Sequence, residues 1–399
     1  MVVQASSTSW SGSADMCMNL VGDLPVVSWT IRKMLDEIPD ARVIIAAPGK
    51  DAQGALAGIA GAFSERVSVF FGHDASPLAR LVACTSALDA DALVLRVDGL
   101  HMFADTAASL DMLLMAARDR LDCVKLPDDF PAQFTSDVYR VGALRRADAM
   151  LTPGRANDVL RVHPKFFMFH HPEAFACRYL PEPPRYDDVT LRRAREIARE
   201  IYRSSRQDVN GRAQWSGDQL QLHYELARPH LTPEMKVLDL ACGNGHGVRL
   251  IADSVREAHG GDGDPDVIDQ ARADTPPNAS FHVVDALSTG FPDASFDAVL
   301  SMETVEHVDG GRFVDELCRV LAPGGLLIMS TPQNSQGRIP VTATHEREYT
   351  LEQAIALVSR RFTIREVIGL KQGRIIIPGD PRGHNTVIFA IRSAAPPSS

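Results

Sequence analysis

The stretch VLDLACGNGHG, residues 237–247, decides the fold of the second half of the chain. It opens with an apolar run typical of a buried strand, and three glycines follow at Gly243, Gly245 and Gly247. Small residues let the backbone approach a ligand, and the amides at a helix N-terminus favour anionic or polar groups. The pattern therefore predicts a strand, a turn and a helix start with a ligand at the turn. Many α/β proteins have such turns, so the stretch alone does not identify the ligand.

Acidic residues end the strands predicted after this turn. Asp262 lies about twenty residues on, at the tip of a strand, where it can accept hydrogen bonds from ribose hydroxyls. Asp285 ends the next strand and suits an exocyclic adenine amine, and the strand from Phe296 ends in Met302 and Glu303. Ligands of such sheets bind beyond the carboxyl ends of the strands. We expect a cofactor to contact these residues: Asp239, Ala241, Gly243, Gly245, Asp262, Gly263, Asp285, Ala286 and Met302. Taken singly, each of these residues can equally be explained as an ordinary part of a strand end, loop or turn that binds no ligand.

The rest of the second half alternates predicted strands and helices. A helix over 217–229 precedes the first strand, and the last two strands are expected to be antiparallel, because a stretch with Gly and Pro (373–383) joins them. The predicted strands are 236–240, 258–261, 280–284, 298–301, 326–330, 362–369 and 385–391.

The region from about 215 to 392 resembles the class I S-adenosylmethionine-dependent methyltransferases. Asp239, Ala241, Gly243 and Gly245 match the first motif of that family, with Ala241 where glycine is common. Further matches are Asp262 with its ribose acid, Asp285 and Ala286 with its adenine-contacting pair, and 317–325 with the helix and turn before its fifth strand. The resemblance implies a Rossmann-like methyltransferase domain over 215–393 that uses S-adenosylmethionine. A dinucleotide site is the weaker alternative, because the turn lacks GxGxxG.

The stretch METVEH, residues 302–307, predicts a metal site. If a helix starts here, Glu303, Glu306 and His307 share one face, and His345 can return to the same place as a fourth ligand. Such a cation, Mg²⁺ or Zn²⁺, would activate a hydroxyl of the methyl acceptor. Without a metal, His307 or His345 is the candidate catalytic base. In a third interpretation, Glu303 faces the cofactor while Glu306 and His307 only serve the helix terminus.

The same stretch is similar to one in metal-assisted O-methyltransferases of ubiquinone biosynthesis and of small-RNA 2′-O-methylation. In the RNA enzymes a later histidine matches His345. A comparable ExxEH stretch occurs in methyltransferases of polysaccharide biosynthesis. This resemblance implies oxygen as the atom that is methylated.

The first half, 1–203, is also predicted to be α/β. Strands over 42–47, 67–71 and 92–97 alternate with helices over 25–37 and 77–88, which indicates a parallel, doubly wound sheet. An arginine-rich amphipathic helix within 187–207 closes this half, 204–214 is the expected linker, and 394–399 is an expected disordered tail. The chain should thus hold two doubly wound α/β domains.

The first half resembles, more faintly, the spore-coat-polysaccharide type of cytidylyltransferase. Stretches at 2–5, 25–29, 72–81, 96–99, 137–140 and 163–173 carry the resemblance. However, no Lys or Arg precedes Arg32, so the loop that would grip a triphosphate lacks its cations, and Asp98 precedes Gly99 instead of following it. We therefore expect a nucleotidyltransferase-like domain that has lost catalysis. It would bind a sugar nucleotide, present the acceptor, or form a homodimer.

Composition limits the remaining possibilities. The 399 residues carry a net charge of −10, which argues against a nucleic-acid partner. Apolar runs are too short for a membrane helix, no secretory signal is visible, and the six cysteines are scattered as in cytoplasmic proteins. The leading hypothesis is O-methylation of a sugar, glycan or nucleotide-sugar hydroxyl. The alternatives are N- or O-methylation of a small metabolite, a sugar-nucleotide-binding or assembly protein, and a nucleotidyltransferase that still functions beside a fused methyltransferase.

Overall fold

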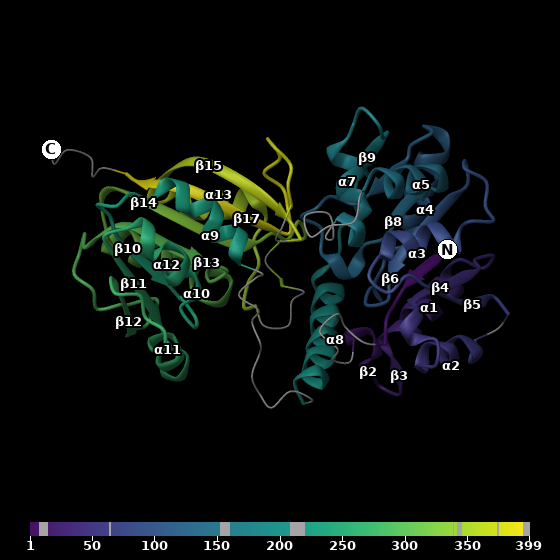
Figure 1. Ribbon diagram of the computed structural model, residues 1–399, viewed down its shortest axis with the longest axis horizontal. Coiled ribbons are helices and arrows are strands. Elements are labelled where there is room, and N and C mark those ends of the chain that lie inside the picture. The colour runs from purple at the N-terminus through teal and green to yellow at the C-terminus, as the bar shows by residue number, and fades with distance from the viewer. Residues whose placement is uncertain are drawn as a thin grey trace. The chain divides into compact units, whose positions relative to one another are not determined.

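The computed structural model divides into two compact units, one on each side of the boundary at residue 213 (Figure 1). It describes residues 1–7, 15–63, 65–151, 160–207, 220–337, 339–340, 345–372 and 375–393. The expected tail, 394–399, lies outside this range, as do 208–214 of the expected linker. Residues 204–207, also expected in the linker, instead belong to a helix.

The N-terminal unit is built on a seven-stranded sheet in the order β5-β4-β1-β6-β8-β7-β9. Its parallel part consists of β1 (Val2–Gln4), β4 (Val43–Pro48), β5 (Val67–Gly72) and β6 (Leu93–Asp98), of which the last three match strands predicted from the sequence. The remaining strands are β7 (Cys123–Lys125), β8 (Asp137–Arg140) and β9 (Cys177–Tyr179), and a separate hairpin joins β2 (Leu20–Val21) to β3 (Leu24–Pro25).

The prediction of a wholly parallel sheet in this unit is wrong. Strand β8 runs antiparallel to both β6 and β7. Its first residue, Asp137, lies opposite Arg96 near the carboxyl end of β6 and forms an ion pair with it, so the chain enters there and runs back along β6. The sheet is therefore mixed.

Helices cover both faces of this sheet. They are α1 (Val26–Glu37), α2 (Ala55–Gly61), α3 (Pro77–Cys84), α4 (Thr106–Arg118), α5 (Val141–Met150), α7 (Pro164–His170) and α8 (Asp188–Gln207). Helix α3 begins where Pro77 follows the cap Ser76, whose side chain accepts from the amide of Ala79. Buried apolar residues form one core cluster with α1 and α2 and another with α3, α5 and α7. Cores on both faces are the arrangement of a doubly wound unit.

The C-terminal unit contains an eight-stranded sheet in the order β12-β11-β10-β13-β14-β17-β15-β16. Five strands are parallel: β10 (Lys236–Leu240), β11 (Glu257–Asp262), β12 (Ala279–Val283), β13 (Phe296–Met302) and β14 (Leu321–Pro332). Strand β17 (Asn385–Arg392) lies antiparallel between β14 and β15 (Phe362–Lys371), and β16 (Ile375–Ile376) pairs with the end of β15. The predicted antiparallel pairing of the last two long strands is confirmed.

Five helices pack on this sheet: α9 (Gln221–Ala227), α10 (His246–Ile251), α11 (Pro265–Arg272), α12 (Gly310–Val320) and α13 (Leu351–Ser359). Helix α13 begins with a capping box between Thr350 and Gln353. Because the parallel strands share one direction, the residues after β10, β11, β12, β13 and β14 all meet at one edge of the sheet. Among the described helices, none combines the length and apolar character that crossing a bilayer requires.

Candidate functional site

The turn after β10 has the backbone that its sequence predicts. Ala241, Gly243 and Gly245 all adopt positive φ, at 65°, 51° and 79°. A Cβ on Gly245 would lie 2.6 Å from the ring of Phe281, and one on Gly247 would lie 2.0 Å from the ring of Tyr224. The turn is therefore held by close packing as well as by conformation. Ala241, a residue with a Cβ, takes the left-handed conformation where the resembling family commonly has glycine.

Asp239 lies below this turn and is fully buried. Tyr224 of α9 donates a hydrogen bond of 3.0 Å to its Oδ2, whereas Oδ1 has no hydrogen-bond partner among the described residues. Burial raises the pKa of Asp239 to about 7, and the nearby Asp262 adds to this shift. A buried acceptor without a partner is costly unless a ligand satisfies it. This orphan oxygen and the close-packed turn above it fit a polar group of a bound cofactor.

The two other predicted acids lie at the same edge of the sheet. Asp262 ends β11 and accepts from the amides of Gly243 (2.9 Å) and Asp264 (3.0 Å), which ties the two neighbouring strand ends together. Asp285 is exposed after β12, and its Oδ1 accepts from the amide of Leu287. Gly263 is exposed, Ala286 is half-buried, and Met302 is buried at the end of β13. The structure thus places all nine predicted cofactor residues at or beside this edge.

No α-helix starts at Glu303, although the proposed shared face of Glu303, Glu306 and His307 depended on one. Glu303 has φ of +52°, and only a short 3-10 helix, η7 (Val305–His307), follows it. Its carboxylate accepts from Ser330 at 2.7 Å and from Asn385 at 2.6 Å, and burial raises its pKa to about 7. These contacts tie Glu303 to β14 and β17. Its charge still reaches Glu306 and His345, but its carboxylate is not in the group of ligand atoms that lie within 4.8 Å of one another. The prediction that Glu303 shares a face with them is wrong.

Three of the four predicted metal ligands do come together. One ligand atom each from Glu306, His307 and His345 lies within 4.8 Å of the others. Glu306 is fully buried, and burial together with the nearby Glu303 raises its pKa well above the usual range. Thr331 donates to its Oε2 at 3.0 Å, while Oε1 has no hydrogen-bond partner among the described residues. A buried carboxylate oxygen beside two imidazoles is a donor set that a divalent cation fits.

Contacts that the sequence did not indicate orient His345. Its Nδ1 lies 2.8 Å from Glu348, and Glu348 in turn accepts from Asn334 at 2.7 Å. The ring of His345 packs edge-on against that of His307, with centroids 5.1 Å apart. A carboxylate on the far nitrogen of a histidine is a common way to fix a ligand or a base. In the sequence, Glu348, three residues after His345, is the feature from which this contact could have been predicted.

His223 is a further buried histidine at this site. It is 1% exposed, neither ring nitrogen has a hydrogen-bond partner among the described residues, and its Nε2 lies 3.7 Å from Oε1 of Glu303. Burial lowers its pKa to about 4, so the ring is neutral at pH 7. Its neighbour Tyr224 contacts Asp239. Helix α9 therefore reaches both the β10 and the β13 ends, as expected for a helix that lines the cofactor site.

Residues 238–329 match the protein family described as "Methyltransferase domain". The C-terminal unit contains a methyltransferase domain. The match runs from β10 into β14 and so includes the glycine turn, Asp262, Asp285 and the Glu303–His307 segment. This confirms the sequence-based recognition of an S-adenosylmethionine-dependent methyltransferase domain in this half.

Several curated methyltransferases are similar to this chain. A probable S-adenosylmethionine-dependent methyltransferase of Mycolicibacterium smegmatis is 33% identical over 160 residues, which are 39% of this chain and 62% of that protein. A similarly named protein of Mycobacterium tuberculosis is 32% identical over 43% of this chain and 64% of its own length. The 2-methyl-6-phytyl-1,4-hydroquinone methyltransferase of Synechocystis is 36% identical over 34% of this chain and 40% of that protein. The chain thus spans less than two thirds of these relatives.

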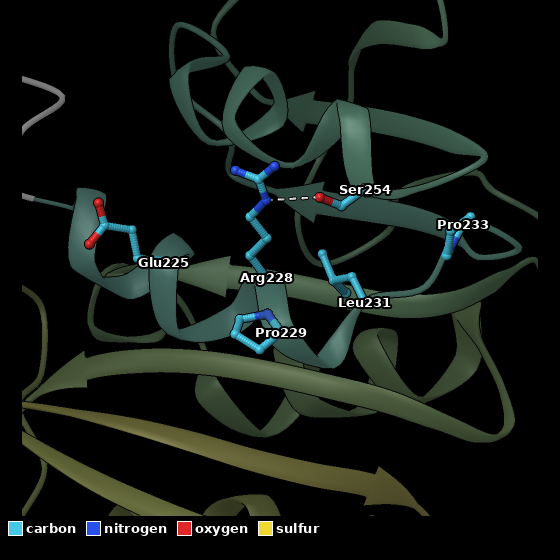
Figure 2. A pocket seen from close by; sticks show the side chains of 6 residues that line it. All are labelled: Glu225, Arg228, Pro229, Leu231, Pro233 and Ser254. Atoms are coloured by element: carbon cyan, nitrogen blue, oxygen red, sulfur yellow. Dashed lines mark hydrogen bonds between the residues drawn. The ribbon is translucent and has the colours of Figure 1, made fainter.

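A surface pocket of about 550 Å³ lies at the other end of the methyltransferase sheet (Figure 2). Glu225, Arg228 and Leu231, among other residues, line it, and Arg228 donates to Ser254 at 2.9 Å. The segments that line it lead into the amino ends of β10 and β11. It is therefore separate from the carboxyl edge where the predicted site residues gather.

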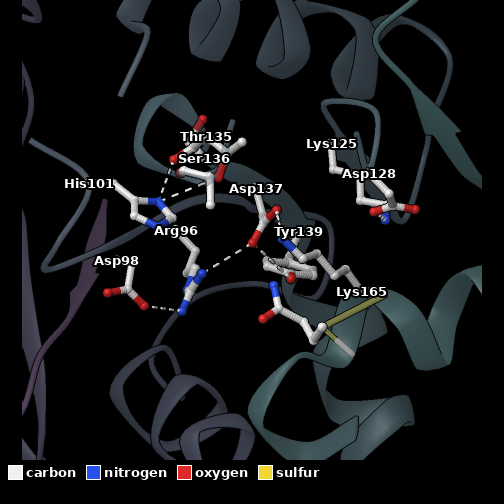
Figure 3. A network of polar contacts seen from close by, with 12 residues as sticks. Arg96, Asp98, His101, Lys125, Asp128, Thr135, Ser136, Asp137, Tyr139 and Lys165 are labelled. Carbon is white, nitrogen blue, oxygen red and sulfur yellow. Dashed lines mark hydrogen bonds and ion pairs between the residues drawn. The ribbon is translucent and has the colours of Figure 1, made fainter. Parts of the chain in front are cut away.

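The N-terminal unit holds a buried network of charges at the end of β6 (Figure 3). Arg96 forms ion pairs with Asp98 (2.9 Å) and Asp137 (3.3 Å), and Lys165 pairs with Asp137 at 2.9 Å. Gln4, at the end of β1, accepts from Arg96. Asp98, the acid singled out in the sequence, is thus paired with a cation of its own chain. The loop expected to have lost its phosphate-binding cations lies partly outside the described residues.

Proposed function

We propose that this chain is a methyltransferase that transfers the methyl group of S-adenosylmethionine to a hydroxyl oxygen. The observation that carries the proposal is the group Glu306, His307 and His345. Glu306 and His307 follow β13, the strand beside β10, whose turn carries the cofactor motif, and His345 comes from the segment after β14. A hydroxyl is a poor nucleophile, so its methylation benefits from a base or a cation, and this group can supply either.

The reaction needs alignment and one proton acceptor. S-adenosylmethionine supplies the methyl group: the acceptor oxygen forms a bond to the methyl carbon, the sulfur–carbon bond breaks, and the sulfonium becomes a neutral thioether. When no cation is bound, the hydroxyl proton passes to His307 or His345, and the contact of His345 with Glu348 stabilises an imidazolium formed there. When both imidazoles hold a cation, the proton leaves to solvent. Asp262 and Asp285 would hold the adenosyl part, so that binding positions the reacting atoms.

A divalent cation, Mg²⁺ or Zn²⁺, is part of the proposal. Glu306, His307 and His345 would hold it, and it would lower the pKa of the acceptor hydroxyl. Glu303, held by Ser330 and Asn385, is not included among the ligands.

The proposed acceptor is a sugar, a glycan or a nucleotide-sugar. The support is the resemblance of the N-terminal half to a cytidylyltransferase that has lost its phosphate-binding cations, which suits a domain that presents a sugar-containing acceptor. This support rests on a likeness of fold, whereas function depends on the residues of the site itself.

A second candidate is N- or O-methylation of another small metabolite. It is favoured by the names of relatives, which include a tocopherol O-methyltransferase, a 27-O-demethylrifamycin SV methyltransferase and a norajmaline N-methyltransferase. A third is a sugar-nucleotide-binding or assembly protein. It would bind sugar nucleotides without transferring a methyl group.

The test combines cofactor binding with methyl transfer. We expect calorimetry to show S-adenosylhomocysteine binding to the intact chain, and Asp262→Asn to weaken it at least tenfold. Asp269→Asn, which changes an exposed acid of α11, is the matched control and should bind as wild type. Radiolabelled transfer to a panel of sugars, nucleotide sugars, phenols and amines, with and without chelator, identifies the acceptor class. No binding of S-adenosylhomocysteine would overturn the proposal, and full turnover in chelator would remove the cation from it.

A further inference from the structure

Two histidines face each other across the outer strands of the methyltransferase sheet, away from the site described above. His259 of β11 lies opposite Ser280 of β12, and His282 follows Ser280 on the same face of that strand. Nδ1 of His259 and Nε2 of His282 are 3.3 Å apart. The hydroxyl of Ser280 lies 2.9 Å from the first nitrogen and 3.0 Å from the second.

This separation is what a tetrahedral cation requires of two imidazole ligands. Zinc–nitrogen bonds of about 2.0–2.1 Å at a tetrahedral angle place the two nitrogens about 3.3–3.4 Å apart. The strands already hold the two nitrogens at that distance, with the rings nearly parallel at an interplanar angle of 16°. Ser280 adds a polar oxygen on the same side.

The surroundings orient the two rings. Nε2 of His259, the nitrogen away from His282, lies 3.3 Å from Oε2 of Glu257. This is the carboxylate contact that metal-bound histidines usually make with their second nitrogen. Phe296 packs edge-on against His259, and Phe291 does the same against His282. Neither side chain of the pair is free to turn without losing these contacts.

Burial favours unprotonated rings because it lowers the pKa of both histidines. At His259 the nearby Glu257 opposes this shift, whereas at His282 the neighbouring His259, Arg272 and Lys236 add to it. Lys236 lies 3.5 Å from Glu257 and so partly offsets its charge. Neutral imidazoles bind metal without first releasing protons. The side chain of His259 remains 16% exposed.

We propose that His259 and His282, assisted by Ser280, form a second metal site of this chain. It would bind a borderline dication such as Zn²⁺ and join β11 to β12. Two imidazoles with nitrogen and oxygen neighbours select such ions over Mg²⁺, which prefers oxygen ligands. The site is independent of the proposed methyl transfer and of the group around Glu306.

The experiment titrates the intact, reduced chain with ZnCl₂ in a buffer that does not bind metals. His307→Asn/His345→Asn removes the first group, so the zinc that this variant still binds belongs elsewhere. We expect about one equivalent to remain, and a further His282→Asn to weaken it at least tenfold. His230→Asn, a histidine that packs on Phe389, is the matched control and should change nothing.

Two outcomes would overturn the site: no zinc bound by His307→Asn/His345→Asn, or equal affinity after His282→Asn is added. In either case, His259, Ser280 and His282 would form only a hydrogen-bonded group that holds no metal. Circular dichroism of each variant checks folding. Binding of S-adenosylhomocysteine should be the same in all of them, which separates a failure here from a failure of the proposed function.

Discussion

At the scale of single residues, a substitution of His223 tests whether this side chain takes part in the reaction or only packs. Its two ring nitrogens are buried without a described partner, which costs about 1–3 kcal/mol of stability. His223→Phe removes the unsatisfied nitrogens and keeps a ring, so we expect urea unfolding to show equal or slightly higher stability. Methyl transfer should nevertheless fall at least tenfold, because a polar contact beside Glu303 is lost. Lower stability with unchanged turnover would contradict this and assign His223 to packing.

A second prediction at the residue scale concerns how Asp239 makes the free energy of unfolding depend on pH. Its folded pKa, about 7, lies above the ordinary aspartate value near 4, so the folded state binds more protons than the unfolded state in that interval. This carboxyl therefore removes stability as pH rises from about 4 to about 7. Asp239→Asn lacks the titration, so its stability relative to wild type should rise over that interval, by up to a few kcal/mol, and then level off.

The measurement for Asp239 is urea unfolding at several pH values between 4 and 8, with chelator present. Other titrating groups act on both proteins and cancel in the difference. A difference that does not depend on pH would show that Asp239 is not a buried, destabilised carboxyl.

At the scale of elements, the turn between β10 and α10 makes a paired prediction. A Cβ on Gly247 would overlap the ring of Tyr224, whereas one on Gly243 meets no atom within 4 Å. We expect Gly247→Ala to displace α9 and cost several kcal/mol of unfolding free energy together with S-adenosylhomocysteine affinity. Gly243→Ala carries only the cost of φ +51°, about 1–2 kcal/mol. Equal losses in the two variants would contradict the packing argument.

The elements that could be predicted from the sequence are those whose conformation is determined by residues close together in the chain. The strands around Leu238, Val299 and Ile328 are short runs of mostly apolar residues, as is typical of buried parallel strands. The helix predicted from Glu303 failed because its left-handed backbone and its contacts with Ser330 and Asn385 are set by β14 and β17. Asn385 lies 82 residues from Glu303, and no periodicity in either segment marks that contact.

At the scale of the whole molecule, the lack of a local sequence signal also explains why the mixed order of the N-terminal sheet was not predicted. Strands β7, β8 and β9 are three or four residues long, too short for an alternation pattern to appear. Strand β8 pairs with a strand distant in the sequence, and its Asp137 forms an ion pair with Arg96, 41 residues away. The two-part organisation, by contrast, followed from two complete sets of alternating strands and helices.

The division into two units predicts that damage to one leaves the other intact. Arg96→Met removes the cation shared by the fully buried Asp137 and the partly exposed Asp98, while Asp137 keeps its ion pair with Lys165; breaking a buried ion pair costs about 3–5 kcal/mol. Calorimetry should show the transition of the N-terminal unit at a lower temperature, while S-adenosylhomocysteine binds as in wild type and raises only the other transition. Arg118→Met, at an exposed pair, is the control and should leave both unfolding transitions at their wild-type temperatures. Loss of S-adenosylhomocysteine binding in Arg96→Met would instead show that the charge network of the first unit supports the site of the second.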